Sequence, residues 1–193
     1  MTEKKPIETI VYGGAFNPPT RAHQAILQAC VDYAEPRRAE VWLLPSASRK
    51  DKAIDESYER RLELCGALTQ DIMRRTVTID INTMELDRQH PTETYDTVCE
   101  LTDTFTDREF TWVFGEDSVA TMSDWNHGDW LLEHLNMLVI GRSGYSAGEL
   151  GPRAVRLAVQ TDGMSSTELR RRLAEGDEYR HLVSPSVGAL LAR

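Results

Sequence analysis

The chain has 193 residues, of which 40% are hydrophobic and 27% are charged, a composition typical of a soluble globular protein. This length predicts one domain over residues 1–193. The net charge of −9 argues against non-specific nucleic-acid binding, which needs a basic face. No apolar run approaches the ~18–20 residues of a membrane span, and the N-terminus lacks the apolar core of a secretory signal. We therefore expect a cytoplasmic protein with no membrane partner.

The three cysteines, Cys30, Cys65 and Cys99, lie far apart in the sequence and form no C-x-x-C pair. A disulfide framework or a cysteine zinc site is therefore not expected. Each cysteine lies in an apolar helical pattern, which predicts that all three are small buried hydrophobic residues. No metal-site spacing links the histidines at His90, His127, His134 and His181.

Strands and helices are predicted to alternate along the chain. Runs of apolar and β-branched residues predict strands at 7–12, 39–44, 76–81, 109–114, 137–140 and 154–159. Apolar residues at helical spacing predict helices at 21–33, 57–72, 94–104, 129–134, 166–175 and 185–192. This alternation predicts an α/β fold with a Rossmann-like, doubly wound parallel sheet of five to six strands and helices on both faces. In such a sheet, ligands bind beyond the carboxyl ends of the strands.

The first predicted strand leads into the stretch GGAFNPPTRAH at residues 13–23. Strand, glycine turn and helix together direct backbone N–H groups and the positive end of a helix at a phosphate. Thr20 and His23 lie one helical turn apart, so a hydroxyl and an imidazole would face the bound group. The alternative interpretation is a helix cap at Thr20 and a surface histidine.

A second candidate phosphate site is the stretch SSTELR at residues 165–170. A Ser or Thr ahead of a helix caps its N-terminus, but three consecutive hydroxylated residues exceed what a cap needs. Arg170 lies one turn into the helix, on the side of the hydroxyls, and such a set of groups suits a di- or triphosphate. The alternative is a cap followed by a solvated basic face, which we favour for Arg171 and Arg172.

Together, these stretches resemble the nucleotidyltransferase superfamily marked by [HT]-x-G-H and S-S-T-x-x-R motifs. Within it, the chain is most similar to the nicotinate (or nicotinamide) mononucleotide adenylyltransferase family. G-x-F-N-P-P-T-x-x-H at 14–23 and S-S-T-x-x-R at 165–170 carry this resemblance. Further segments agree in order, namely Leu44-Pro45 followed by Lys50 and Lys52, R-R-L-E-L at 60–64, T-x-T-Y-D-T at 92–97, and G-E-D at 115–117 followed by Trp125. The resemblance covers nearly the whole chain.

The resemblance implies adenylyl transfer from ATP to nicotinate mononucleotide, which yields deamido-NAD and pyrophosphate in NAD biosynthesis. The alternatives are a nicotinamide mononucleotide adenylyltransferase, a sibling enzyme acting on another phosphate such as phosphopantetheine, and a non-catalytic nucleotide-sensing relative. The implied cofactor is Mg²⁺, held mainly by phosphates and water rather than by protein ligands. The implied partners are ATP and a pyridine mononucleotide, and a homo-oligomer is compatible with the family.

The resemblance also implies site residues. Catalysis would involve His23, Thr20, Arg170, and Lys50 or Lys52, between which the sequence does not choose. ATP would be bound by Gly13, Gly14, Ala15, Phe16, Asn17, Ser165, Ser166, Thr167, Gly115 and Asp117. The mononucleotide would be bound by Thr94, Tyr95, Trp125 and Arg142.

Some of these positions have more than one interpretation. Asp117 would accept hydrogen bonds from a ribose, or would cap a helix that begins at Ser118. Trp125 would stack on the pyridine ring. Trp130 is expected in core or lid packing.

The chain departs from the family pattern at three positions. Thr20 stands where most bacterial members have His, and members with Thr there are known. Ala22 stands where they have Gly, and it adds a methyl group near the phosphates. Glu116 replaces the commoner Ala and adds a negative charge near the nucleotide site. We expect these departures to affect substrate preference more than the class of reaction.

Overall fold

The computed structural model describes residues 5–47, 54, 56–88, 93–141, 150–161 and 165–192. Within these residues, six strands form one sheet in the order β3-β2-β1-β4-β5-β6, and every neighbouring pair is parallel. The strands are β1 (Ile7–Gly14), β2 (Glu40–Pro45), β3 (Ile79–Ile81), β4 (Arg108–Gly115), β5 (Asn136–Ile140) and β6 (Ala154–Leu157). β2 and β3 lie on one side of β1, and β4, β5 and β6 lie on the other. The strand order therefore reverses between β1 and β4, which is the switch point where doubly wound sheets bind ligands.

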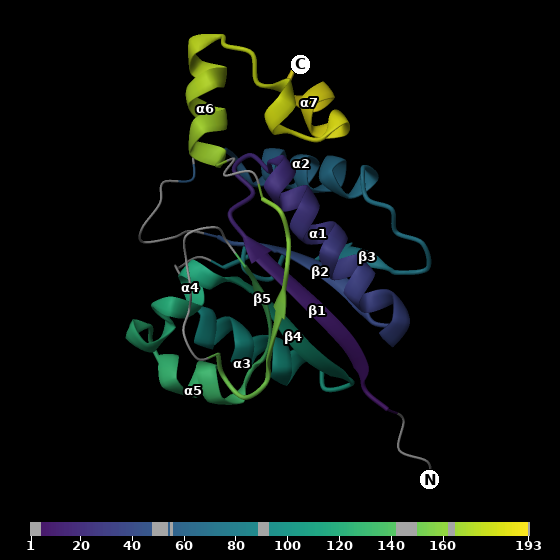
Figure 1. Cartoon of the computed structure of the whole chain (residues 1–193), viewed down its shortest axis with the longest axis vertical. Coiled ribbons are helices and arrows are strands. Elements are labelled where there is room, and N and C mark those ends of the chain that lie inside the picture. The colour runs from purple at the N-terminus through teal and green to yellow at the C-terminus, as the bar shows by residue number, and fades with distance from the viewer. Residues whose placement is uncertain are drawn as a thin grey trace.

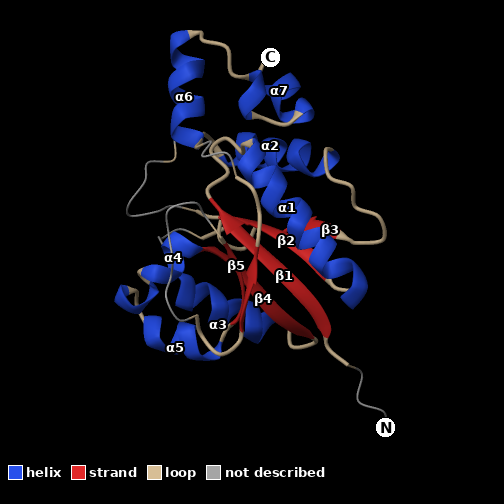
Figure 2. Ribbon diagram, viewed as in Figure 1, coloured by secondary structure: helices blue, strands red, loops and turns tan. Residues whose placement is uncertain are grey.

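Helices cover both faces of the sheet, as Figure 2 shows in blue around the red strands. The helices are α1 (Arg21–Ala34), α2 (Tyr58–Gln70), α3 (Thr94–Thr104), α4 (Glu116–Ala120), α5 (Gly128–His134), α6 (Ser166–Glu175) and α7 (Pro185–Leu191). The expected doubly wound parallel sheet is therefore confirmed.

Alternate side chains along the strands separate two hydrophobic cores. Ile10 and Leu43 pack in the first core with buried residues of α1, α2, α6 and α7. Val11 and Trp42 point to the opposite face and pack in the second core with α3, α4 and α5. Figure 1 shows the same division, with α3, α4 and α5 on one side of the sheet and α1 and α2 on the other. None of the described helices is both long and apolar enough to cross a membrane.

The third strand is shorter than predicted, because only Ile79–Ile81 of the expected 76–81 pair with β2. The chain first completes a turn, in which the Val77 N–H donates to the carbonyl of Arg74 at 2.8 Å and Arg75 has a φ of 52°. β-branched residues mark strand propensity, but they do not show where such a turn ends.

The helix after β4 begins earlier than predicted. Gly115 is the N-cap of α4, and Glu116 and Asp117 form its first turn. The prediction that Asp117 caps a helix beginning at Ser118 is therefore wrong, because the helix starts as soon as the strand ends.

The cysteines are buried in two of three cases. Cys30 and Cys65 lie in the first core, and burial raises the pKa of each thiol to about 12. Cys99 is only half-buried on α3, which corrects the expectation for that residue.

Candidate active site

The predicted phosphate turn, residues 13–23, lies at the carboxyl edge of the sheet between β1 and α1. Gly14 ends β1 and pairs with Pro45 at the end of β2. A Cβ at Gly14 would lie 3.2 Å from Cζ of Phe16, whose ring is fully buried and whose φ is 45°. The missing side chain at Gly14 therefore lets the turn fold over the Phe16 ring, in addition to leaving the backbone open to a ligand.

Thr20 and His23 contact each other directly at the start of α1. Nδ1 of His23 lies 3.0 Å from the Thr20 backbone N and 2.9 Å from its hydroxyl. Because an amide N–H can only donate, Nδ1 is the acceptor, and a neutral ring carries its proton on Nε2. Burial lowers the pKa of His23 from 6.5 to about 4. Near neutral pH, His23 is therefore an uncharged imidazole with an Nε2–H donor.

The second predicted phosphate site packs directly against the first. Ser165 caps α6 by accepting a hydrogen bond from the Glu168 N–H at 3.2 Å. The Ser166 hydroxyl donates to the carbonyl of Pro18 at 2.8 Å, and Arg170 Nη1 donates to the carbonyl of Asn17 at 2.7 Å. Two motifs from distant parts of the sequence thus form one surface with the guanidinium of Arg170 beside the glycine turn.

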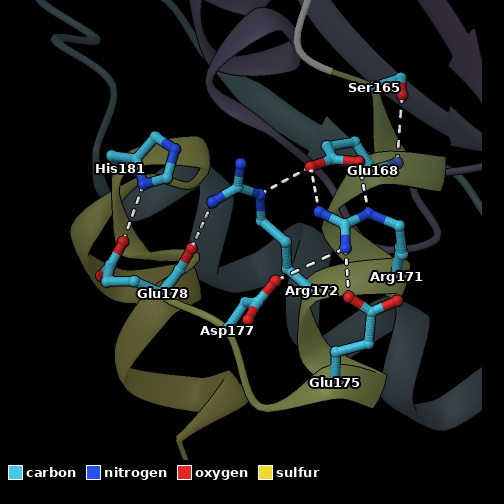
Figure 3. A network of polar contacts seen from close by, with 8 residues as sticks. All are labelled: Ser165, Glu168, Arg171, Arg172, Glu175, Asp177, Glu178 and His181. Carbon is cyan, nitrogen blue, oxygen red and sulfur yellow. Dashed lines mark hydrogen bonds and ion pairs between the residues drawn. The ribbon is translucent and has the colours of Figure 1, made fainter.

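Arg171 and Arg172 belong to the solvent-facing network of α6 shown in Figure 3. Both donate to Glu168, with distances of 2.8 Å from Arg171 Nη2 and 2.7 Å from Arg172 Nε to the same carboxylate oxygen. These hydrogen bonds lower the pKa of Glu168 to about 2. This arrangement agrees with the solvated basic face expected for these two arginines.

A cavity of about 510 Å³ opens beside the phosphate turn at the carboxyl ends of β1, β2, β4 and β5. Of the predicted site residues, it is lined by Gly13, Gly14, Thr94, Gly115 and Trp125. Residues that the sequence analysis did not predict also line it, namely Tyr12, Ile26, Leu44, Ser46, Glu85, Glu93, Thr97, Trp112, Val113, Phe114, Ser118, Asp124, Asn126 and Ile140. Polar groups and aromatic rings therefore meet in one pocket, as expected for a small-molecule site.

The predicted mononucleotide residues lie in different surroundings. Thr94 begins α3, and the Trp125 ring packs edge-on against Phe114, with ring centroids 6.2 Å apart. The Tyr95 ring instead stacks on His127 at 3.9 Å and meets Trp130 edge-on at 5.3 Å, so its ring belongs to an aromatic cluster outside the cavity lining. Trp130 is 38% exposed, so it is a surface residue rather than a core one.

Gly115, Glu116 and Asp117 form the connection from β4 to α4. A Cβ on Gly115 would lie directly against Oδ1 of Asp117, so the Asp117 carboxylate packs directly over the backbone of Gly115. Glu116 is buried and pairs with Arg156 of β6, with 2.8 Å between Oε1 and Nη2. The negative charge that Glu116 brings is therefore compensated by a nearby arginine.

Arg61 is a residue near the site that the sequence analysis did not select. It lies on α2, is 2% exposed, and donates to the backbone carbonyls of Ala15 and Ser46. Burial lowers the pKa of its guanidinium. The sequence did contain a signal for this residue, because Arg61 falls at helical spacing with the apolar residues of α2. A charged side chain on a buried helix face needs hydrogen-bond partners there.

The remaining predicted site positions are Ala22, Lys50, Lys52 and Arg142. Ala22 is half-buried near the start of α1. Lys50, Lys52 and Arg142 lie outside the described residues. Among the described residues, no group of three or more His, Cys, Asp or Glu side chains could hold a metal ion.

Comparisons with known proteins place this geometry in a family. The model of the Cytidylyltransferase-like family matches residues 11–172. A probable nicotinate-nucleotide adenylyltransferase of Oceanobacillus iheyensis is 31% identical over 181 residues, which cover 92% of this chain and 90% of that protein. Another, from Thermus thermophilus, is 31% identical over 182 residues and covers 92% of each chain.

Solved structures agree on the fold. Plasmodium falciparum nicotinic acid mononucleotide adenylyltransferase complexed with NaAD superimposes with a TM-score of 0.81 at 19% identity, covering 96% of this chain and 95% of that one. Since the family model spans most of the chain and the bacterial relatives match it over nearly their full length, the chain belongs to the Cytidylyltransferase-like family and, within it, to the nicotinate-nucleotide adenylyltransferases.

Proposed function

We propose that this protein transfers the AMP group of ATP to nicotinate mononucleotide, forming deamido-NAD and pyrophosphate. The observation that best supports this proposal is the direct contact between the two phosphate-binding motifs, through Ser166 to Pro18 and Arg170 to Asn17, beside a 510 Å³ cavity. The names of the bacterial relatives support nicotinate mononucleotide as the second substrate.

In this reaction, a phosphate oxygen of the mononucleotide attacks the α-phosphorus of ATP, and the bond from that phosphorus to the bridging β-phosphate oxygen breaks. The step needs little covalent chemistry from the protein, so positioning and charge stabilisation supply most of the rate. The groups at this site are hydrogen-bond donors of that kind. No nucleophilic side chain is required.

Each group at the phosphate turn has a proposed role. The Nε2–H of His23 donates to the α-phosphate as negative charge grows there, and Thr20 fixes the ring by contacting Nδ1. The backbone of residues 13–17 cradles the triphosphate. Ser165, Ser166, Thr167 and Arg170 hold the β- and γ-phosphates and the departing pyrophosphate, and Lys50 or Lys52 contacts the reacting phosphates.

The cavity end of the site would take the mononucleotide. Thr94 and Trp125 line it, and the pyridine ring would lie against the indole of Trp125. Tyr95 and Arg142 complete the proposed mononucleotide site. Gly115 is the last residue of β4, and Asp117 lies just beyond it, where its carboxylate would accept hydrogen bonds from the ribose of ATP.

Magnesium is the proposed metal, and it neutralises phosphate charge when bound. We expect phosphate oxygens and water to hold the ion, because Mg²⁺ usually keeps several waters when it binds substrate phosphates. Arg170 and the helix ends then supply positive potential, and the neutral His23 supplies a hydrogen-bond donor.

Pyrophosphate release from ATP tests the proposed function directly. Nicotinate mononucleotide, nicotinamide mononucleotide and phosphopantetheine are offered separately, with ATP alone as the blank. We expect release with nicotinate mononucleotide. ATP binding without release for any acceptor would contradict the proposal and would indicate a nucleotide-sensing protein.

Nicotinamide mononucleotide is the second candidate substrate, because three carboxylates line the cavity, Glu85, Glu93 and Asp124. Negative charges at these positions oppose the carboxylate of nicotinate more than the neutral amide of nicotinamide. The ratio of kcat/KM for the two mononucleotides decides between them. A ratio below one would identify the amide as the preferred substrate.

A further inference from the structure

The guanidinium of Arg61 is buried between two loops at the carboxyl edge of the sheet. Its Nε donates to the carbonyl of Ala15 at 2.9 Å, and its Nη2 donates to the carbonyl of Ser46 at 2.5 Å. Ala15 belongs to the phosphate turn, and Ser46 directly follows β2. A buried cation is costly unless its N–H groups are hydrogen-bonded, so this arrangement persists only while both carbonyls stay in place.

The carboxylate of Glu85 continues this connection to α3. It accepts a hydrogen bond from the Thr97 hydroxyl at 2.7 Å, and the nearby backbone N–H of Ala47 lowers its pKa. Thr97 is 1% exposed and lies in the first part of α3, which begins at Thr94. Thr94, Thr97 and Glu85 all line the cavity. Burial raises the pKa of Glu85, while the hydrogen bond from Thr97 and the charges of Arg88 and Arg61 oppose this rise.

The segment of Ser46 and Ala47 lies between the buried guanidinium of Arg61 and the half-buried carboxylate of Glu85. The Ser46 N–H donates to the carbonyl of Gly14 at 2.9 Å, so the segment contacts the phosphate turn as well. A continuous polar connection therefore runs from residues 14–15, through residues 46–47 and Glu85, to Thr97. It joins the two ends of the site that would hold ATP and the mononucleotide.

We propose that Arg61 and Glu85 are positioning residues, which hold the phosphate turn and the start of α3 in one geometry through the Ser46–Ala47 segment. This proposal rests on the proposed function, because it takes ATP to bind at the phosphate turn and the mononucleotide to bind at the α3 end. Neither residue needs to touch the reacting atoms.

The planar fork of arginine is suited to this task. Two of its nitrogens reach two carbonyls in different loops at once, whereas a lysine ammonium is a single point charge on a flexible stem. Lysine at position 61 would keep the charge but hold the two loops less precisely. Methionine would remove the charge and leave both carbonyls without this donor.

Binding of an ATP analogue with a methylene group between the α- and β-phosphorus tests the role of Arg61. We expect Arg61→Met to weaken analogue binding, measured by calorimetry, by roughly 10- to 100-fold, because small misplacements of positioning groups have effects of this size. Arg61→Lys should show an intermediate loss. Arg60→Met is the matched control, since Arg60 is on the same helix but contacts Glu63 and the carbonyl of Leu190.

The same measurement on Glu85 variants tests the connection across the site. Glu85→Leu removes the acceptor for Thr97 and the carboxylate beside Ala47, and it should weaken analogue binding, although Glu85 lies at the mononucleotide end. Glu85→Gln keeps an acceptor and should weaken it less. Asp87→Asn is the matched control, because Asp87 contacts Thr83 and Tyr58 at the surface. The losses in Arg61→Met and Glu85→Leu should be non-additive in the double variant.

Two results would overturn the proposal. The first is a cooperatively folded Arg61→Met, or Arg61→Lys if the methionine variant does not fold, that binds the analogue as the unmodified protein does. The second is a Glu85→Leu variant whose only change is a higher KM for the mononucleotide. Analogue binding does not depend on turnover, so an unmodified protein that binds the analogue but releases no pyrophosphate would refute the proposed function alone.

Discussion

His23 shows how the contacts of a single residue determine its chemical state. The Thr20 N–H donates to Nδ1, and burial lowers the pKa to about 4, so the ring is neutral and carries an Nε2–H that can donate to a ligand. The Phe16 ring, with its centroid 5.4 Å from that of His23, packs against the imidazole. The residue is therefore oriented before any substrate binds.

Removing the imidazole tests this role. If its donor stabilises charge at the α-phosphate, His23→Ala should lower kcat by roughly 10²–10³-fold, the range for a lost oxyanion donor. His181→Ala is the control, because Nδ1 of His181 lies 2.8 Å from the carboxylate of Glu178 at the surface. A His23→Ala variant with near-normal turnover would show that the assignment is wrong.

The lowered pKa of His23 also predicts a pH dependence of stability. Because the folded pKa is about 4 and the ordinary value is 6.5, the unfolded chain binds the proton more readily. The contribution of His23 is fully present above pH 6.5 and is lost as pH falls toward 4. Between pH 7 and pH 4.5, the unmodified protein should lose roughly 2 kcal/mol more unfolding free energy than His23→Gln, as measured by urea unfolding. Equal losses in both proteins would contradict the protonation state inferred here.

At the scale of elements, α7 is held to the rest of the fold by Asp71, which directly follows α2. The carboxylate accepts hydrogen bonds from the N–H and the hydroxyl of Ser186, each at 2.8 Å, at the start of α7. Burial alone would raise the pKa of Asp71, but the hydrogen bonds from Ser186 oppose it, and the pKa lies below the ordinary value. A helix N-terminus is stabilised by such a negative charge.

Substituting Asp71 should therefore loosen α7. We expect Asp71→Ala to lower the unfolding free energy by about 1–2 kcal/mol near neutral pH, because hydrogen bonds to a charged group are lost. The difference should shrink as pH falls through the folded pKa of Asp71, where the carboxylate becomes protonated. Asp103→Asn, at an exposed position of α3, is the control for removal of one surface charge. Unchanged urea denaturation of Asp71→Ala would exclude this role.

At the scale of the whole molecule, the N-terminal and C-terminal parts of the chain meet at the site. α6 and α7 lie beyond the end of the sheet toward which β1 points (Figure 1), and Ser166 and Arg170 of α6 contact the loop that follows β1. The two adjacent serines at the start of α6 have separate roles. Ser165 caps the helix, whereas Ser166 donates a hydrogen bond to the carbonyl of Pro18.

This division predicts different effects for two neighbouring substitutions. Ser165→Ala should lower the unfolding free energy by about 1 kcal/mol, the usual cost of a lost N-cap. Ser166→Ala should instead weaken binding of the methylene ATP analogue by about 10-fold, because a lost hydrogen bond beside a phosphate misplaces the two motifs. Calorimetry and urea unfolding on both variants separate the effects. If both variants lost the same unfolding free energy and the same affinity for the analogue, the separate roles of Ser165 and Ser166 would be contradicted.

Local patterns in the sequence predict most of the elements. The helix at 94–104 and the helix at 166–175, which ends at Gly176 with a φ of 71°, have the predicted bounds because caps and apolar spacing are properties of neighbouring residues. β3 is shorter than predicted because the extent of strand pairing depends on a partner strand that is distant in the sequence. α4 starts earlier than predicted because Gly115 both ends β4 and caps the helix.

The sequence by itself determined the alternation of strands and helices, the glycine turn, and the family resemblance through its motifs. Only the tertiary structure decided that Ser166 and Arg170 touch the loop at Asn17 and Pro18, that Tyr95 turns to His127, and that Arg61 is buried against two carbonyls. The physical reason is that periodicity and capping act over a few residues. The partner of a buried charge is chosen by which distant backbone atoms the fold brings within hydrogen-bond distance.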